Sequence, residues 1–259
     1  MTAGNNAAQQ HIVLRFYRDD TFIVSYPKSG NTWIRFILAN LLAPGETISF
    51  RNIDQLIPDI HKVKEKISEA KRPRLIKSHF SDFFKVYSRF IYVYRDGRDV
   101  MVSLYFYLLQ LGFQGSFSAF LKRRPLFGKW HEHVSLAFAE MERRTLSETL
   151  AVRYEDMLEA PFPVARQLAN FCRLSVSDEE VQRAVDKCAF ESLQEVERKY
   201  GPENGSKPCS FFRRGKAGQW QEMFSQMELQ RFYEEAGETL IRCGYKIHPQ
   251  TEIVKSSPR

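Results

Sequence analysis

Cysteine is scarce in this sequence. Its 259 residues contain four, Cys172, Cys188, Cys209 and Cys243, and no two are spaced as C-x-x-C. A chain of this length does not build a disulfide framework from so few cysteines, so we expect reduced thiols and a cytoplasmic protein. Histidine is also sparse, and the pair His131 and His133 alone is too little to bind a metal ion.

Long hydrophobic runs are missing too. The longest, over residues 34–43, carries Arg35 near its start and is too short to span a bilayer. The first ten residues, MTAGNNAAQQ, have neither the basic nor the apolar region of a signal peptide. We therefore expect no stable membrane insertion. The length fits a single domain over residues 1–259, with flexible tails at 1–10 and 254–259.

No block of like charge dominates the chain, although the net charge is +7 and the pI is near 9.2. This balance favours an anionic partner, which charge alone leaves open among nucleic acid, an acidic membrane surface and a polyanionic small molecule.

Apolar segments with the character of buried strands alternate with helical patterns. We expect strands in TFIVSYP (21–27), RLIK (74–77), RFIYVYRD (89–96) and LAVRYEDML (150–158), and helices over residues 31–42 and 97–111. Beyond residue 161 the chain is helical, with capping boxes at Ser177 with Glu180 and Ser225 with Glu228. Such an order predicts an α/β fold with a P-loop-like central parallel sheet, flanked by helices on both faces.

The first expected strand runs into YPKSGNTW, which has the form of a phosphate-binding loop. Gly30 permits a tight turn, and the free N–H groups of the helix that follows favour an anion. The lysine of G-x-x-x-x-G-K-[ST] follows the second glycine, whereas Lys28 precedes the only glycine here.

Polar residues follow the other strands as well, and ligands of open parallel sheets bind at this edge. They are Lys77 and His79, Arg95 and Asp96, and Tyr154 to Asp156. Two functions are compatible with a phosphate loop and a basic chain. An ATP-dependent P-loop kinase would need Mg²⁺ and an acidic ligand for it, for which only Asp96 is suitably placed. A nucleic-acid or anionic-lipid binding protein would need one basic stripe with interleaved aromatic residues.

The motifs YPKSGNTW, IKSHF, YVYRDGRDVMVS, RYEDM and FRRGKAGQW occur in this order between about Thr21 and Trp220. Together they resemble the cytosolic sulfotransferase family. The resemblance implies that the chain moves a sulfonate group from 3′-phosphoadenosine 5′-phosphosulfate (PAPS) to a hydroxyl or amine acceptor. The product of the donor is adenosine 3′,5′-bisphosphate (PAP), and no metal is needed.

The same resemblance implies a role for each matching residue. His79 would be the general base, and Lys28 and Lys77 would stabilise charge on the group in transfer. The donor would be bound by Lys28, Ser29, Gly30, Asn31, Thr32, Trp33, Arg95, Ser103, Tyr154, Phe190, Arg213, Arg214 and Gly215. Trp33, Tyr154 and Phe190 would surround the adenine, and Arg95, Ser103 and the Arg213–Gly215 segment would bind the 3′-phosphate. We expect Arg98 and Asp99 to form a local ion pair instead.

The sequence departs from the family in two places. Cys188 and Ala189 replace the usual hydroxyl residues before Phe190, and Gln221, Ser225, Gln226 and Gln230 replace the family's dimerisation motif. The oligomeric state is therefore open. So is the acceptor, which can be a small molecule, a carbohydrate or a lipid.

Overall fold

The computed structural model describes residues 15–62, 67, 72–203 and 211–247. Both expected tails lie outside these residues. One sheet is formed by β1 (Thr21–Ser25), β2 (Leu75–Ser78), β3 (Arg89–Tyr94) and β4 (Thr149–Arg153). Its strand order is β2-β1-β3-β4 and every pairing is parallel. The predicted α/β class with a central parallel sheet is confirmed.

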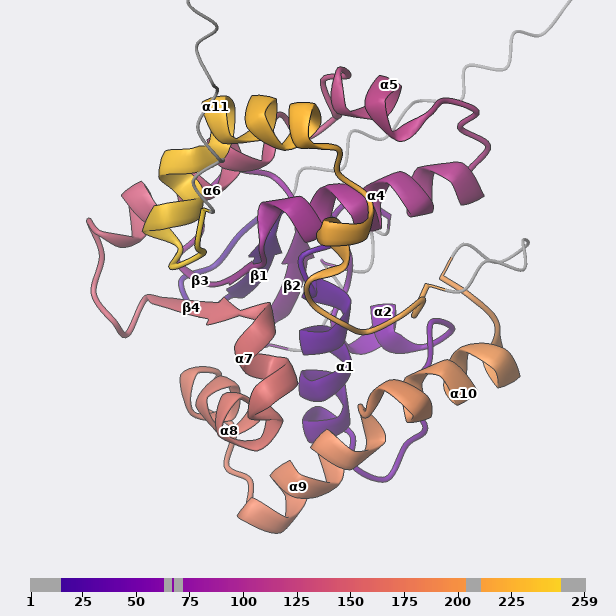
Figure 1. Cartoon of the computed structure of the whole chain (residues 1–259). Coiled ribbons are helices and arrows are strands. Elements are labelled where there is room, and N and C mark those ends of the chain that lie inside the picture. The colour runs from indigo at the N-terminus through magenta and orange to yellow at the C-terminus, as the bar shows by residue number, and fades with distance from the viewer. Residues whose placement is uncertain (1–14, 63–66, 68–71, 204–210, 248–259) are drawn as a thin grey trace, which may run out of the picture.

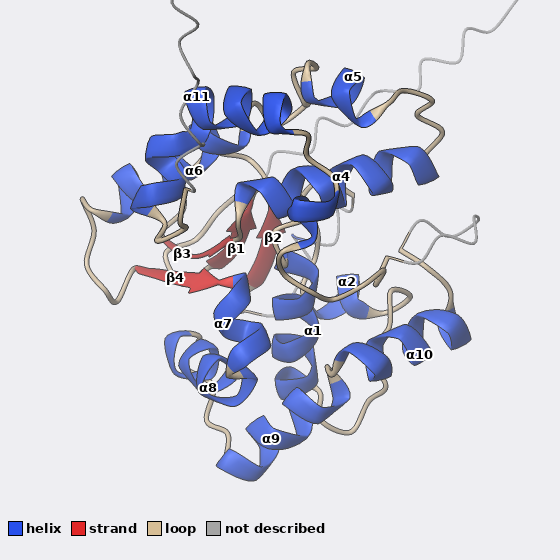
Figure 2. Cartoon of the chain, viewed as in Figure 1, coloured by secondary structure: helices blue, strands red, loops and turns tan. Residues whose placement is uncertain are grey.

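Helices cover both faces of the sheet (Figures 1 and 2). In the view of Figure 1, α1, α7, α8, α9 and α10 lie below the sheet and α4, α5, α6 and α11 lie above it. Their bounds are α1 (Asn31–Leu42), α2 (Ile53–Leu56), α4 (Gly97–Gln110), α5 (Phe117–Leu121), α6 (Trp130–Met141), α7 (Tyr154–Glu159), α8 (Pro161–Phe171), α9 (Asp178–Lys187), α10 (Phe190–Tyr200), the 3₁₀ helix η1 (Gln219–Glu222) and α11 (Gln226–Arg242).

The alternation of side chains along each strand creates two hydrophobic cores. Ile23 of β1 belongs to the core beneath α1, α8 and α9, whereas its neighbours Phe22 and Val24 belong to the core beneath α4, α6 and α11. Successive residues of a strand point to opposite faces, so a sheet covered on both sides needs apolar residues at every position. This is why β1 and β3 read as continuous apolar runs.

Most local expectations are confirmed, and a few boundaries differ. Both capping boxes form, with Ser177 accepting from the Glu180 N–H and Ser225 from the Glu228 N–H. The fourth strand ends at Arg153 because the next residue begins α7. The helical stretch after Ser177 divides into α9 and α10, since Ala189 between them is extended (φ −56°, ψ 149°).

The position of β1 determines where a ligand can bind. The chain leaves β1 for β2 on one side and later returns to β3 on the other, so the connections diverge at the carboxyl end of β1. Open α/β sheets bind their ligands at such a point. Within the described ranges, every helix is too short or too polar to cross a bilayer.

Candidate active site

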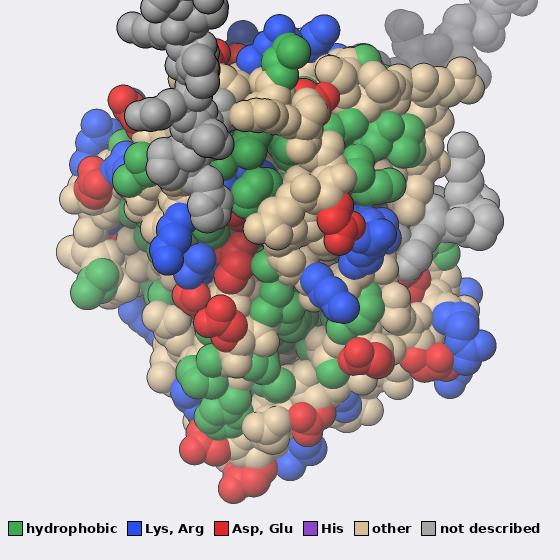
Figure 3. Space-filling model, viewed as in Figure 1, with side chains coloured by type: hydrophobic (Ala, Val, Ile, Leu, Met, Phe, Trp, Pro, Cys, Tyr) green, Lys and Arg blue, Asp and Glu red, His purple; other side chains and the backbone are tan. Residues whose placement is uncertain are grey.

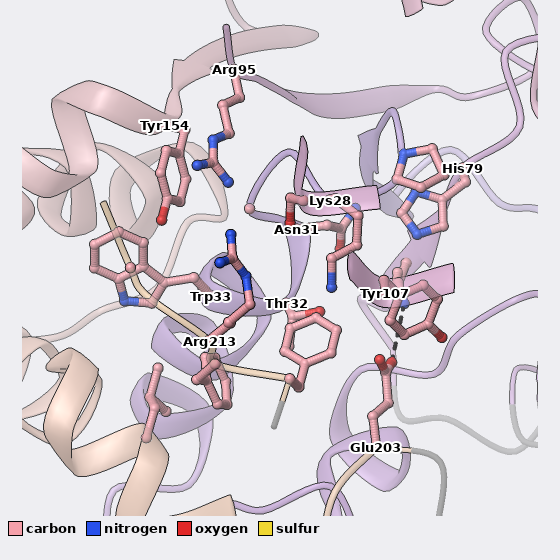
Figure 4. A pocket seen from close by; sticks show the side chains of 18 of the residues that line it. Lys28, Asn31, Thr32, Trp33, His79, Arg95, Tyr107, Tyr154, Glu203 and Arg213 are labelled. Carbon is pink, nitrogen blue, oxygen red and sulfur yellow. Dashed lines mark ion pairs between the residues drawn. The ribbon is translucent and has the colours of Figure 1, made fainter. Parts of the chain in front are cut away.

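A cavity of about 290 Å³ lies at the carboxyl edge of the sheet. The predicted residues that line it are Lys28, Gly30, Asn31, Thr32, Trp33, Lys77, His79, Arg95, Ser103, Tyr154, Phe190, Arg213, Arg214 and Gly215. Figure 3 shows a hollow with hydrophobic side chains near the middle of the visible face and Lys and Arg side chains beside it. In Figure 4 the labelled side chains form two groups, Trp33, Arg95, Tyr154 and Arg213 at one end and His79, Tyr107 and Glu203 at the other, with Lys28 between them.

The phosphate loop between β1 and α1 adopts a strained conformation. Gly30 has φ 108°, and a Cβ there would come within 2.7 Å of the Tyr154 ring. Lys28 also has a positive φ, 69°, which is uncommon for a non-glycine residue and is typical of functional sites. Among the described residues no side chain caps the first turn of α1, so this twelve-residue helix presents its N-terminal dipole to the cavity.

The side chains of Asn31 and Ser29 in the loop are directed into the protein. Asn31 donates through Nδ2 to the Ile23 carbonyl oxygen at 2.9 Å, which fixes the end of β1 against the start of α1. Ser29 does not line the cavity. Its hydroxyl is buried and has no hydrogen-bond partner among the described residues.

The ring-lined end of the cavity is held by a hydrogen bond from Trp33. The indole Nε1–H donates to the Cys188 carbonyl oxygen at 2.9 Å, and Tyr154 meets the indole edge to face at 5.8 Å. The Cys188 side chain is buried in the core beneath α1, and burial raises the pKa of its thiol to about 12. Cys188 therefore supplies a backbone acceptor for Trp33 and keeps a neutral thiol.

Three arginines gather around this same end. The Arg95 guanidinium lies 4.2 Å from the Tyr154 ring centre and donates to the Lys216 carbonyl oxygen at 3.0 Å. Arg213 lies 4.1 Å from the Phe106 ring, and burial, together with Arg214 and Arg95, lowers the pKa of its guanidinium. Since positive charges crowd here, a bound anion would relieve their repulsion.

The segment that carries Arg213 is anchored at both ends by carboxylates. Glu197 of α10 accepts the Phe211 and Phe212 N–H groups at 2.5 and 3.2 Å. Asp99 of α4 accepts the Gly218 and Trp220 N–H groups at 2.7 and 3.0 Å. These two anchors hold residues 211–220 over the cavity from opposite helical layers.

The expected ion pair between Arg98 and Asp99 is wrong. Arg98 donates to both carboxylate oxygens of Asp96, through Nε to Oδ1 at 2.9 Å and to Oδ2 at 3.2 Å, and through Nη2 to Oδ2 at 2.6 Å. Arg98 and Asp99 are adjacent in α4, so their side chains point in different directions. Asp96 is the N-cap of α4, and its carboxylate lies within reach of the Arg98 side chain.

At the opposite end, His79 is fixed in one orientation and one tautomer. Its Nδ1 lies 2.7 Å from the Ser25 carbonyl oxygen, which can only accept, so Nδ1 carries the hydrogen and Nε2 has the lone pair. The backbone of His79 is held on both sides, since its N–H donates to His61 Nε2 at 2.8 Å and its carbonyl accepts from His133 Nε2 at 3.0 Å.

The protonation state of His79 follows from its surroundings. Burial, and then the nearby positive charge of Lys77, lower the pKa of the imidazole well below its ordinary value. His79 is therefore neutral near pH 7, with its lone pair available to accept a proton.

Lys77 is held in a buried charge cluster. Its Nζ lies 2.8 Å from Asp59 Oδ2 and 3.6 Å from Glu203 Oε1, and Lys62 binds the same Glu203 oxygen at 2.8 Å. Burial alone would raise the pKa of Glu203, but Lys77 and Lys62 outweigh it and lower the pKa to about 2. The cluster keeps both carboxylates ionised and Lys77 in place.

Several residues of this end were missed by the sequence reasoning. They are the supports Asp59, His61, His133 and Glu203, and the rings of Tyr107 and Phe211. The segment 58–60 runs beside β2 with a single bridge, Asp59 to Lys77, so it carries no strand periodicity. The only signal for His61 was the histidine itself, two residues after an acid. Within the described part of the chain, no group of three His, Cys, Asp or Glu side chains could hold a metal ion.

The chain matches the Sulfotransferase domain family over residues 18–244. Cytosolic sulfotransferase 1 of Danio rerio is 28% identical over 264 residues, covering 91% of this chain and 86% of the relative. Sulfotransferase 4A1 of Homo sapiens is 30% identical over 224 residues, covering 80% of this chain and 75% of the relative. Sulfotransferase 1E1 of Mus musculus is 28% identical over 260 residues, covering 88% and 85%.

Solved structures share the fold. Mouse sulfotransferase SULT7A1, complexed with PAP, superposes with a TM-score of 0.67 at 23% identity, over 89% of each chain. Retinol dehydratase, in a complex with retinol and PAP, superposes with a TM-score of 0.68 at 18% identity, over 92% of this chain and 85% of that chain. The domain match over residues 18–244 includes every residue that lines the cavity. The chain therefore belongs to the sulfotransferase family, in its cytosolic type, and is an enzyme that transfers a sulfonate group from the donor PAPS.

Proposed function

We propose that sulfonate is transferred across this cavity to a hydroxyl group, with His79 as the general base. The observation that carries the proposal is the order of groups along one cavity. The arginines and rings expected to hold the nucleotide lie at one end, the imidazole lies at the other, and Lys28 lies between them. A donor held at the first end would present its sulfonate toward the second.

The donor end has features that suit an anionic nucleotide. Arg95 lines the cavity, and its buried Nε has no partner among the described residues, so it has unused hydrogen-bonding capacity there. At Gly215 (φ 59°) a Cβ would come within 2.3 Å of the Phe190 ring, so only glycine lets this backbone approach the ring. These features support the assignment of the 5′-phosphate to the loop and α1, and of the 3′-phosphate to Arg95, Ser103 and Arg213–Gly215.

The chemistry then follows from the residues at the other end. The acceptor oxygen attacks sulfur, the bond from sulfur to the bridging oxygen breaks, and the acceptor proton passes to His79 Nε2. Negative charge grows on the bridging oxygen as PAP forms, and Lys28 and Lys77 stabilise it. The hydrogen bond from Nδ1 to Ser25 keeps the imidazole oriented during this transfer.

We propose an acceptor with a flat, apolar body that carries the hydroxyl. The acceptor end is bounded by aromatic rings. Phe127 lies 5.6 Å from the His79 ring and 5.3 Å from the His61 ring, and Tyr107 lies at the same end. Phe211 lines the cavity next to Lys28, whose Nζ is 3.7 Å from its ring. Rings of this kind bind phenols and fused-ring alcohols through their faces and edges. A carbohydrate would leave many of its own hydroxyl groups without hydrogen-bond partners against these rings.

We further propose that the enzyme works in the cytoplasm as a single domain. The thiols of Cys172, Cys188 and Cys243 are free and buried, as expected in a reducing compartment. The zebrafish relative is itself named a cytosolic sulfotransferase.

Transfer from ³⁵S-labelled PAPS to a panel of phenols, fused-ring alcohols, primary alcohols and monosaccharides tests the proposal. We expect labelled product from members of the first two groups, formed without added metal, and saturable PAP binding by calorimetry. Product from monosaccharides alone would contradict the acceptor class. Absence of PAP binding would contradict the assignment of the donor end.

The pH dependence of kcat/KM tests the link between Lys77 and His79. In the wild type we expect activity to fall only well below pH 6.5, because His79 must first be protonated and its pKa is lowered. Lys77→Met removes a charge that lowers this pKa and leaves Asp59, which raises it. The acidic limb should therefore move to higher pH.

Lys62→Met is the matched control for this shift. Lys62 also binds Glu203, but it is not a main contributor to the pKa of His79. An acidic limb that moves equally in both variants, or stays fixed in Lys77→Met, would contradict the coupling.

A further inference from the structure

A second cavity, of about 240 Å³, lies on the α4, α5, α6 and α11 side of the sheet. It opens between α5, the start of α6 and the first half of α11, elements that lie together in the upper part of Figure 1. None of the residues of the candidate active site described above lines it. The two cavities are therefore separate spaces.

The floor and the rim of this second cavity differ in chemistry. The floor is apolar, with Met101, Phe120, Trp130 and Phe232 among its side chains. Trp130 is 2% exposed, and its Nε1–H has no acceptor among the described residues, so the floor also contains an unsatisfied donor. The rim is basic, with the side chains of Lys122, Arg123, Arg124, Lys129 and Arg231.

The carboxylates of the rim are already engaged. Glu235 pairs with Lys129 at 2.8 Å, and Glu228 accepts the Ser225 N–H and hydroxyl in the capping box of α11. Lys122 forms no ion pair with any described residue, whereas the charge of Arg231 helps to lower the pKa of the Glu228 carboxyl. The rim therefore carries more positive charge than its carboxylates neutralise.

An apolar floor beneath a basic rim selects one class of ligand. An inorganic anion would leave the floor uncovered, and a neutral aromatic compound would leave the rim unpaired. A nucleotide would need donors for two or more phosphate groups, whereas α6, which begins at this lining, already has the Glu132 carboxylate in its first turn, accepting the Lys129 N–H at 2.9 Å. We propose that the second cavity binds an amphipathic organic anion, a flat apolar body bearing one carboxylate or sulfonate group.

The same cavity is connected to the active site by one loop. Residues 122–125 and 129 line the second cavity, whereas Phe127 of that loop lines the active site and packs on His79. Tyr26 forms part of the second cavity, donates to the Gly128 carbonyl oxygen at 3.1 Å, and is the first residue of the phosphate loop. A ligand held by Lys122 therefore fixes the loop that positions Phe127 in the acceptor end.

Binding of 2-naphthoate to the PAP-saturated enzyme, measured by calorimetry, tests the site. Saturating PAP fills the donor end, and a carboxylate is a poor mimic of an acceptor hydroxyl. We expect one saturable site, and much weaker binding of methyl 2-naphthoate, which has the same body without the charge. The double variant Lys122→Gln/Arg231→Gln should bind 2-naphthoate roughly tenfold more weakly, since two charge-assisted contacts are lost.

The matched control is Lys85→Gln/Arg183→Gln, which removes two exposed cations that line neither cavity. Its affinity for 2-naphthoate should equal that of the wild type. Equal affinity in the Lys122/Arg231 variant, or equal binding of the ester, would overturn the proposal. So would a loss of binding in Phe211→Ala instead, because that would place the ligand in the active-site cavity.

Amide hydrogen exchange tests the connection to the loop. Peptides covering residues 122–129 should exchange more slowly when 2-naphthoate is added to the PAP complex, whereas peptides from α9 should not change. Unchanged exchange in residues 122–129 despite calorimetric binding would show that the ligand does not fix the loop and would overturn that part of the proposal.

Discussion

His79→Ala should lower kcat by roughly 10²–10⁴-fold while leaving the affinity for PAP within about twofold of the wild type. The imidazole is oriented by Ser25, its lone pair is available near pH 7, and it lies at the end of the cavity away from Arg95, Arg213 and Trp33. Removing it should therefore remove proton transfer and little of the binding of the donor. Single-turnover transfer from labelled PAPS and calorimetry with PAP measure the two effects separately.

Added imidazole provides the control for this variant. If the loss is that of a base, free imidazole should enter the space left by the side chain and restore part of the rate, more at higher pH where it is neutral. A variant that keeps a near wild-type rate would contradict the assignment of the base. A parallel loss of PAP affinity would instead mean that His79 supports the fold of the cavity.

Arg95→Ala should weaken PAPS binding roughly 10- to 100-fold, the range for loss of hydrogen bonds to a charged group. Its guanidinium stacks on Tyr154, is tied to Lys216 and retains a buried Nε without a partner in the described chain. A 3′-phosphate at this position would take up that capacity. Adenosine 5′-phosphosulfate lacks the 3′-phosphate, so its affinity should fall by less than about threefold in Arg95→Ala.

Arg153→Ala is the matched control for the loss of charge. Arg153 also ends a strand, but it pairs with Glu155 and Asp156 and does not line the cavity. The affinity for PAPS should change little in Arg153→Ala, because salt screens the interaction between a charge outside the cavity and a ligand within it. Equal weakening of PAPS and adenosine 5′-phosphosulfate by Arg95→Ala would contradict the assignment to the 3′-phosphate.

The end of the cavity that arginines and aromatic rings line could be predicted from the sequence because its parts follow directly from local rules. Parallel strands end at one edge, so residues just past β1, β2 and β3 had to meet there. The bounds of α1 and the two capping boxes follow from spacing alone. The ordered motifs then identified the donor.

The end of the cavity that contains His79 could not be predicted in the same way. His61 reaches His79 from a segment that makes a single bridge to β2, and Glu203 reaches Lys77 across more than a hundred residues of sequence. Neither contact leaves a periodic pattern in the chain. The pairing of Arg98 with Asp96 depends on the N-cap geometry of α4, which turns the Asp96 carboxylate back toward Arg98.

The segment 211–220 joins the two halves of the molecule. Phe212 is buried in the core beneath α1, and Trp220, eight residues later, is buried in the core beneath α4. A nucleotide gripped by Arg213 and Trp33 would bind only where both cores are intact, so it would make their melting a single cooperative event. At a concentration one hundred times its Kd it would add about 2.7 kcal/mol to the free energy of unfolding. The supply of donor nucleotide would then set the heat resistance of the enzyme as well as its rate.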